Sequence, residues 1–185
     1  MTASTPSPAG QAATTQTDPE RADLLAGLGD ARHFLRFTVR DLTDEQARQR
    51  TTASELTLGG LIKHVTAMEQ GWATFVLEGP SALGDFSDMT EADLARWADQ
   101  FKLLPGETLD GVLADYEKVA QRTDDLVASL PDLNLSHPLP NAPWYPPGEH
   151  RSARWVFLHI IAETAQHAGH ADIIRESLDG AKSMG

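Results

Sequence analysis

Apolar side chains recur every three or four positions along four long stretches of the chain, the spacing of amphipathic helices. The first of these apolar faces consists of Leu24, Leu28, Ala31 and Leu35. Each stretch follows a side chain that can cap a helix start, and Gly or Pro marks the end of most of them. The capping residues are Asp18, Thr57, Thr108 and Ser152. We expect helices over residues 19–40, 58–77, 109–130 and 153–178.

The connections between these helices differ in length and character. Residues 81–106 form a long crossover with a short helix after Thr90, and such a crossover lets helices depart from simple up-down order. Residues 131–150 hold six prolines, which exclude a regular helix or a central strand. In the second helix, three glycines each weaken the helix by about 1 kcal/mol relative to Ala, so packing must compensate. The pattern predicts an all-α four-helix bundle with a long crossover between helices two and three.

Length and composition fit one domain. The chain has 185 residues, 41% hydrophobic and 23% charged, which suits a globular protein with a single core. We expect the bundle to span residues 18–180, between a disordered N-terminal tail at 1–17 and a short C-terminal tail at 181–185. Residues 1–17 contain no large apolar residue beyond Met1 and no signal-peptide pattern, so we expect a cytoplasmic protein.

Charge and cysteine content exclude several classes of chemistry. The formal net charge of -12 disfavours binding to nucleic acid and to anionic membranes. The absence of cysteine excludes disulfides, thiolate metal ligands and a thiol nucleophile from the protein itself. Any thiol chemistry would need a small-molecule thiol.

The segment HIIAETAQHAGHADIIRE, residues 159–176, carries the candidate chemistry. With Val156 as zero and about 100° per residue, Glu163 falls at about -20°, His167 at about 20° and His170 at about -40°. These three polar residues therefore interrupt an apolar stripe. A buried carboxylate without a partner costs several kcal/mol, and a bound metal ion is one way to compensate for that cost.

A metal site can be assembled from two helices. Glu163 and His167 are four residues apart, one turn of helix, and His64 lies on the edge of the second helix's apolar stripe. Two imidazoles and a carboxylate are the ligands of many catalytic zinc and non-heme iron sites. Two alternatives stay open: His64 as a hydrogen-bonded boundary residue, and Glu163 with His167 as an ion pair. His159 or His170 could replace a ligand or support one.

The segment GGLIKHVTAMEQGW, residues 59–72, together with ETAQHAGHADIIRE resembles the actinobacterial branch of the DinB-like superfamily of metal-binding four-helix bundles. The resemblance covers nearly the whole folded part. It implies that His64, Glu163 and His167 bind a divalent metal, zinc first, with nickel, iron or manganese as alternatives. Glu rather than His at position 163 resembles the N-terminal domain of mycothiol-dependent maleylpyruvate isomerase.

The resemblance implies a metal-dependent thiol S-transferase or isomerase that uses mycothiol as cosubstrate. His170 is the candidate catalytic residue, as a proton carrier in a hydrolase that would use the same three ligands to activate water. Trp72, Trp144 and Tyr145 either line the site opening or anchor the core and loops. The expected partners are a small-molecule thiol and an electrophilic substrate, with a homodimer allowed for. The alternatives are a metal-dependent hydrolase that activates water, and a non-catalytic stress-related protein with a structural metal.

Overall fold

Capping side chains begin the four long helices at the residues that the sequence predicts. The hydroxyl of Thr57 accepts a hydrogen bond from the Gly60 N–H, and that of Ser152 accepts one from the Trp155 N–H. At the other end, α6 stops at Gly180, whose φ of 78° favours glycine. The computed structural model describes residues 18–84 and 89–183 and gives the long helices as α1 (Pro19–Thr38), α3 (Leu58–Glu78), α5 (Leu109–Ser129) and α6 (Ala153–Asp179). The tail expected at residues 1–17 lies outside the described residues, as do residues 184–185.

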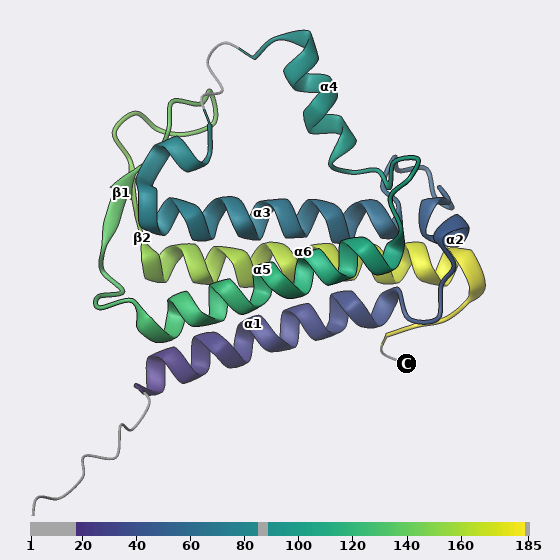
Figure 1. The fold of residues 1–185 in the computed structure, drawn as a ribbon, viewed down its shortest axis with the longest axis horizontal. Coiled ribbons are helices and arrows are strands. Elements are labelled where there is room, and N and C mark those ends of the chain that lie inside the picture. Colours follow the sequence, from purple (N-terminus) through teal and green to yellow (C-terminus); the bar gives the residue numbers. More distant parts are fainter. Residues whose placement is uncertain (1–17, 85–88, 184–185) are drawn as a thin grey trace, which may run out of the picture.

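The four long helices form a bundle whose neighbours depart from simple up-down order (Figure 1). Helix α1 packs on α6, α6 on α3 and α3 on α5, and α5 also contacts α1. The bundle has α3 and α5 running in one direction and α1 and α6 in the other, because the long crossover returns the chain to the end where α3 began. The predicted all-α four-helix bundle is confirmed.

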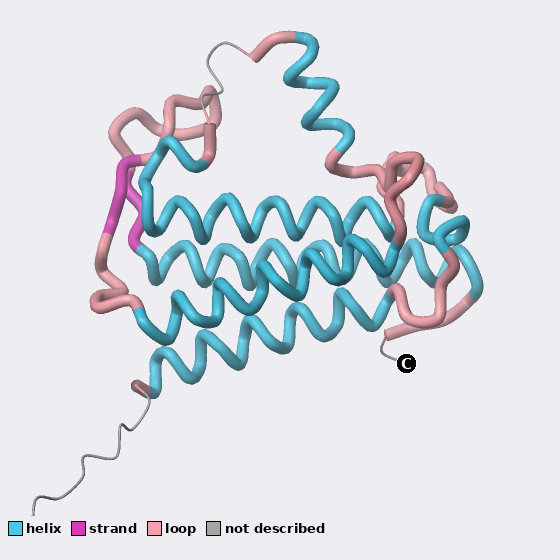
Figure 2. Tube along the Cα trace, viewed as in Figure 1, coloured by secondary structure: helices cyan, strands magenta, loops and turns pink. Residues whose placement is uncertain are grey.

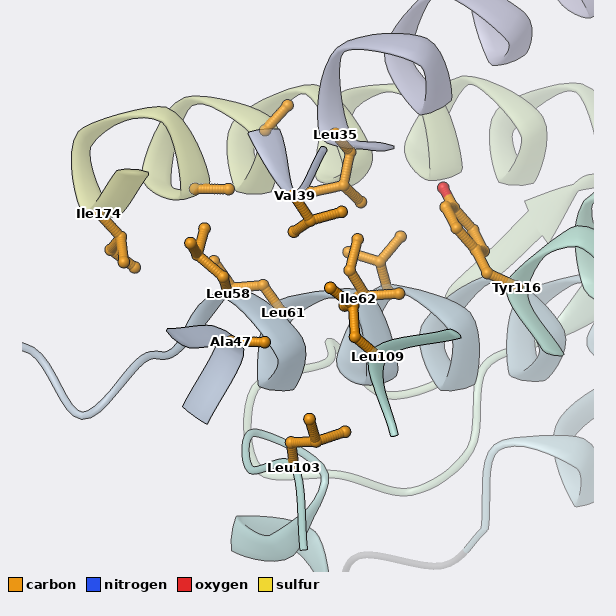
Figure 3. Packing of buried hydrophobic residues seen from close by; sticks show 13 residues of the cluster. Leu35, Val39, Ala47, Leu58, Leu61, Ile62, Leu103, Leu109, Tyr116 and Ile174 are labelled. Atoms are coloured by element: carbon orange, nitrogen blue, oxygen red, sulfur yellow. The ribbon is translucent and has the colours of Figure 1, made fainter. Parts of the chain in front are cut away.

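Two apolar clusters fill the bundle, one toward each end. One joins the starts of α3 and α5 to the ends of α1 and α6, and Figure 3 shows its side chains converging, among them Leu58, Leu61, Leu109 and Ile174. The other cluster surrounds Phe75 and Phe157 at the opposite end. The four residues of the first predicted apolar face are all buried inside the bundle: Leu24, Leu28, Ala31 and Leu35.

A charged cluster also lies inside the bundle. Arg32 of α1 and Glu69 of α3 are 4% and 0% exposed. The Arg32 guanidinium donates to both carboxylate oxygens of Glu69, at 2.5 and 3.2 Å, and to Asp124 of α5 at 2.7 Å. Burial by itself lowers the pKa of Arg32, but the two carboxylates outweigh it and raise that pKa. Arg32 therefore joins α1 to α3 through a buried ion pair and α1 to α5 through a partly buried one.

Short elements complete the chain (Figure 2). They are α2 (Asp44–Arg48), the 3-10 helix η1 (Gly79–Ala82), α4 (Glu91–Asp99), β1 (Ser136–Pro138) and β2 (His150–Ser152). The strands pair antiparallel, with His137 opposite Arg151, in the proline-rich segment where the sequence predicts a loop. Both strands are edges of a two-stranded ribbon, which tolerates proline as a central strand would not.

Helix α4 differs from the long helices because none of its residues is buried. Thr90 caps it with a reciprocal bond from Asp93, as the sequence predicts, and Figure 1 shows it set off from the bundle above α3. In the described ranges, no helix is long and apolar enough to cross a membrane.

Candidate functional site

Histidines from two helices meet at the seam between α3 and α6. The imidazole centroids of His64 and His167 are 4.9 Å apart, with an edge-to-face angle of 81°. The Nε2 atom of His167 lies 3.5 Å from Oε2 of Glu163, one helical turn earlier. The structure thus brings His64 beside His167, and His167 beside Glu163, as expected from their spacing.

Two further histidines flank this group on α6. His170 Nδ1 is 3.5 Å from His167 Nδ1, and His159 Nε2 is 3.9 Å from Glu163 Oε1. The His159 ring stacks on Trp155 with centroids 4.7 Å apart and meets the edge of Trp72 at 4.9 Å. Aromatic side chains thus hold His159 beside Glu163. The role of His170 as a catalytic proton carrier stays a prediction.

The segment after α4 covers His64. The Phe101 ring stacks on the His64 ring with centroids 4.2 Å apart. This close approach requires glycine at position 60, because a Cβ there would lie 1.9 Å from the Phe101 carbonyl oxygen. The glycine that weakens α3 as a helix thus lets the Phe101 backbone approach α3 one turn before His64.

Burial favours the neutral form of three imidazoles at the site. Burial first, and the neighbouring His167 second, lower the pKa of His64 to about 4. Burial also lowers the pKa values of His159 and His167, although the Glu163 carboxylate opposes this. Neutral imidazole is the form that binds a metal ion.

The candidate site residues of α6 lie at the edge of its buried face rather than along its middle. Ile160, Thr164, Ala171 and Ile174 are buried, whereas Glu163, His167 and His170 are half-buried. The prediction that these three residues interrupt an apolar stripe centred on Val156 is therefore wrong. The centre of the buried face passes through Ile160 and Thr164. The site residues face a partly accessible seam, which suits a site that a substrate must reach.

The donor types fit a divalent metal, although the side chains do not surround one point. Across residues 18–84 and 89–183, no group of three or more His, Cys, Asp or Glu side chains is arranged to hold a metal ion. One atom nevertheless calls for a partner: His64 Nδ1 is buried and makes no hydrogen bond. An unpaired buried polar atom is costly, and coordination would remove that cost.

A cavity of about 330 Å³ opens beside His64. Residues of α3, η1 and α4 and the proline-rich loop contribute to its walls. Of the three residues considered from the sequence as lining residues, Trp72 and Tyr145 line it and Trp144 does not. The sequence predicts a short helix after Thr90, but it does not predict that Trp97 lines the cavity or that Phe101 stacks on His64. Nothing in helical periodicity reveals them, since they depend on the path of the crossover.

Comparison with known proteins places these features in a family. No curated protein matches the chain significantly. The family model described as mycothiol-S-transferase matches residues 23–180, which include all four long helices except the first residues of α1, and all of the candidate site. The chain, whose DinB-like bundle carries this histidine cluster, belongs to the mycothiol-S-transferase family.

Proposed function

We propose that this protein joins mycothiol, through its thiol sulfur, to an electrophile. The reaction would use a divalent ion held by His64, Glu163 and His167, with zinc as the first candidate. The family match supports the reaction class. The observation that carries the metal proposal is His64 Nδ1, a buried donor or acceptor without a partner, on a ring 4.9 Å from that of His167. A metal ion between α3 and α6 would give this nitrogen a partner.

The chain's own residues prepare the site for thiol chemistry. When bound, a divalent cation lowers the pKa of a coordinating thiol and so supplies thiolate near neutral pH. The neutral imidazoles of His64 and His167 offer lone pairs to the cation, and Glu163 offers one negative charge. Because the protein has no cysteine, no thiol of its own competes for the cation or the electrophile.

The transfer itself needs few groups from the protein. The thiol sulfur forms a bond to an electrophilic carbon of the substrate, the bond from that carbon to its leaving group breaks, and the thiol proton passes to solvent. The chain therefore has to hold two substrates side by side and exclude water from the reacting carbon. Phe101 and Trp72, which cover His64 and His159, are positioned to limit water at the seam.

The metal assignment is tested by metal content. We expect about one divalent ion per wild-type chain. His167→Ala should lose most of this metal, because removing one of three ligands greatly weakens binding of the ion. His33→Ala is the matched control, since His33 is an exposed histidine of α1 outside the cluster. The measurement is elemental mass spectrometry after dialysis. Equal metal content in the two variants would contradict the assignment.

Glu163→Gln separates a catalytic ion from a structural one. The substitution keeps the shape of the side chain and removes its charge. For a catalytic site, metal-dependent mycothiol transfer falls while the midpoint of thermal unfolding changes little. For a structural brace, metal binding is coupled to folding, so the midpoint falls in step with metal loss. A wild type that unfolds on chelation and transfers thiol to none of the electrophiles offered would overturn the enzyme proposal.

A further inference from the structure

The cavity beside His64 is lined mainly by apolar and aromatic side chains. Its large lining side chains are apolar or aromatic: Met68, Trp72, Leu83, Trp97 and Tyr145. Among the described residues that line it, none is Asp, Glu, Lys or Arg, and its polar groups are neutral side chains such as the amide of Gln100.

A second groove on the bundle has a charged lining, in contrast to the cavity beside His64. It has the same volume of about 330 Å³ and lies along α3 and α5. Its lining includes Lys63, Lys118 and Arg122 together with two carboxylates. These three cations line the groove along α3 and α5, and the described lining of the cavity beside His64 includes no Lys or Arg. In the metal-free protein, a carboxylate placed in the cavity beside His64 would lose part of its hydration without gaining a cationic side chain from the lining.

From this contrast we propose that the cavity lined by Trp72, Trp97 and Tyr145 binds the electrophile, and that the electrophile is an uncharged aromatic molecule. The inference rests on the proposed function for its reaction, but the binding claim stands on the cavity itself. Aromatic walls favour a flat ligand by stacking and by burial of apolar surface. Because His64 lies in the cavity wall, a molecule bound there sits next to a candidate metal ligand, where the thiol would arrive.

This assignment favours one of the two reactions that the sequence leaves open, thiol S-transfer and isomerisation. Maleylpyruvate, the substrate of the isomerase that the sequence resembles, carries carboxylates and is anionic at neutral pH. The walls of the cavity offer such a ligand no cationic side chain. They fit S-transfer to a neutral acceptor, in which a carbon–sulfur bond forms, a leaving group such as chloride departs from the same carbon, and the thiol proton goes to solvent.

Binding can be measured without turnover by a matched pair of unreactive probes, dinitrobenzoate and its methyl ester. They share a flat ring and differ in one negative charge. Isothermal titration calorimetry on the full chain after chelation avoids capture of the carboxylate by a metal ion. We expect the ester to bind about tenfold more tightly or better, since the anion loses its hydration without gaining a cation. Equal binding, or tighter binding of the anion, overturns the proposal.

Trp97→Ala tests the location, with Leu94→Ala as its control. Both side chains are on α4 and are about equally exposed, at 50% and 53%, so neither change removes core packing. Only Trp97 lines the cavity. We expect Trp97→Ala to weaken ester binding about tenfold and Leu94→Ala to leave it unchanged. Equal losses in the two variants, or none in either, overturn the assignment of the cavity.

Turnover distinguishes this inference from the proposed function. The zinc-restored protein is given mycothiol with chlorodinitrobenzoate or its methyl ester, which lose chloride on attack by the thiol. A rate preference for the ester that disappears in Trp97→Ala supports both proposals. Selective ester binding without transfer to any electrophile supports the cavity and refutes the transferase. Transfer at equal rates to ester and acid, with no binding preference, refutes the cavity and leaves the transferase standing.

Discussion

Removing the charge of Glu69 should destabilise this protein more than most single substitutions. Glu69 is fully buried and shares the Arg32 guanidinium with Asp124, whose side chain is 38% exposed. Glu69→Gln leaves Arg32 buried opposite an amide, with one carboxylate remaining at the bundle surface. Breaking a buried pair by removing one partner costs about 3–5 kcal/mol, because the other charge stays desolvated.

The expected magnitude can be read from thermal and chemical unfolding. In a chain of this length, about 3–5 kcal/mol corresponds to a fall of roughly 6–20 °C in the unfolding midpoint. A surface pair supplies the control: Arg36 and Glu117 are 2.8 Å apart with side chains 34% and 65% exposed. Glu117→Gln should cost about 0–1 kcal/mol, since water already solvates that pair. Urea unfolding of both variants gives the two free energies directly.

A paired replacement tests the reasoning behind the number. Changing Arg32 to Met together with Glu69 to Leu removes both buried charges, so most of the loss seen in Glu69→Gln should be recovered. The free energy of unfolding of the double variant should therefore exceed that of Glu69→Gln. The argument fails if Glu69→Gln costs no more than Glu117→Gln, or if the double variant is less stable than the single one.

Two further predictions concern Tyr116 and Gly60. Burial and the charge of Glu69 raise the pKa of Tyr116 above that of an unfolded tyrosine, so the unfolded state loses its proton first and stability falls as pH rises above about 10. Tyr116→Phe should reduce the loss of unfolding free energy between about pH 10 and 11 by about 1 kcal/mol, and equal pH slopes in urea titrations would refute this. Gly60→Ala should lower the unfolding midpoint, because its Cβ meets the Phe101 backbone, whereas Gly29→Ala, with open space around it, should raise stability by about 0.5–1 kcal/mol. A rise in midpoint for both variants would contradict the close approach at Gly60.

The helices and their limits could be predicted from sequence because their signals are local. Thr57, Thr108 and Ser152 all cap the helices that they were expected to cap. The relation between His64 and the α6 pair followed from helical spacing together with the family resemblance. The exact orientation of α6 about its axis was not predicted. The apolar stripe was centred on Val156, whereas the middle of the buried face includes Thr164, a polar residue.

The buried charges show what reasoning from apolar residues misses. Glu69 follows Ile62 and Val65 at spacings of seven and four, and it precedes Trp72 by three, so it occupies a core position of α3. Arg32 likewise lies four after Leu28 and three before Leu35. These spacings were available in the sequence, but which carboxylate meets which guanidinium depends on how α1 and α3 are placed side by side. Long-range placement of this kind has no local signal.

The absence of buried residues from α4 has a consequence for how the acceptor specificity of such a protein can diversify. Walls supplied by α3 are constrained by the bundle core, since Trp72 both lines the cavity and packs inside the second apolar cluster. Trp97, by contrast, lines the cavity from α4, a helix with no buried residue. Substitutions along α4 therefore alter the cavity wall without removing a buried side chain, so this wall can vary with less effect on folding stability than the wall that α3 supplies.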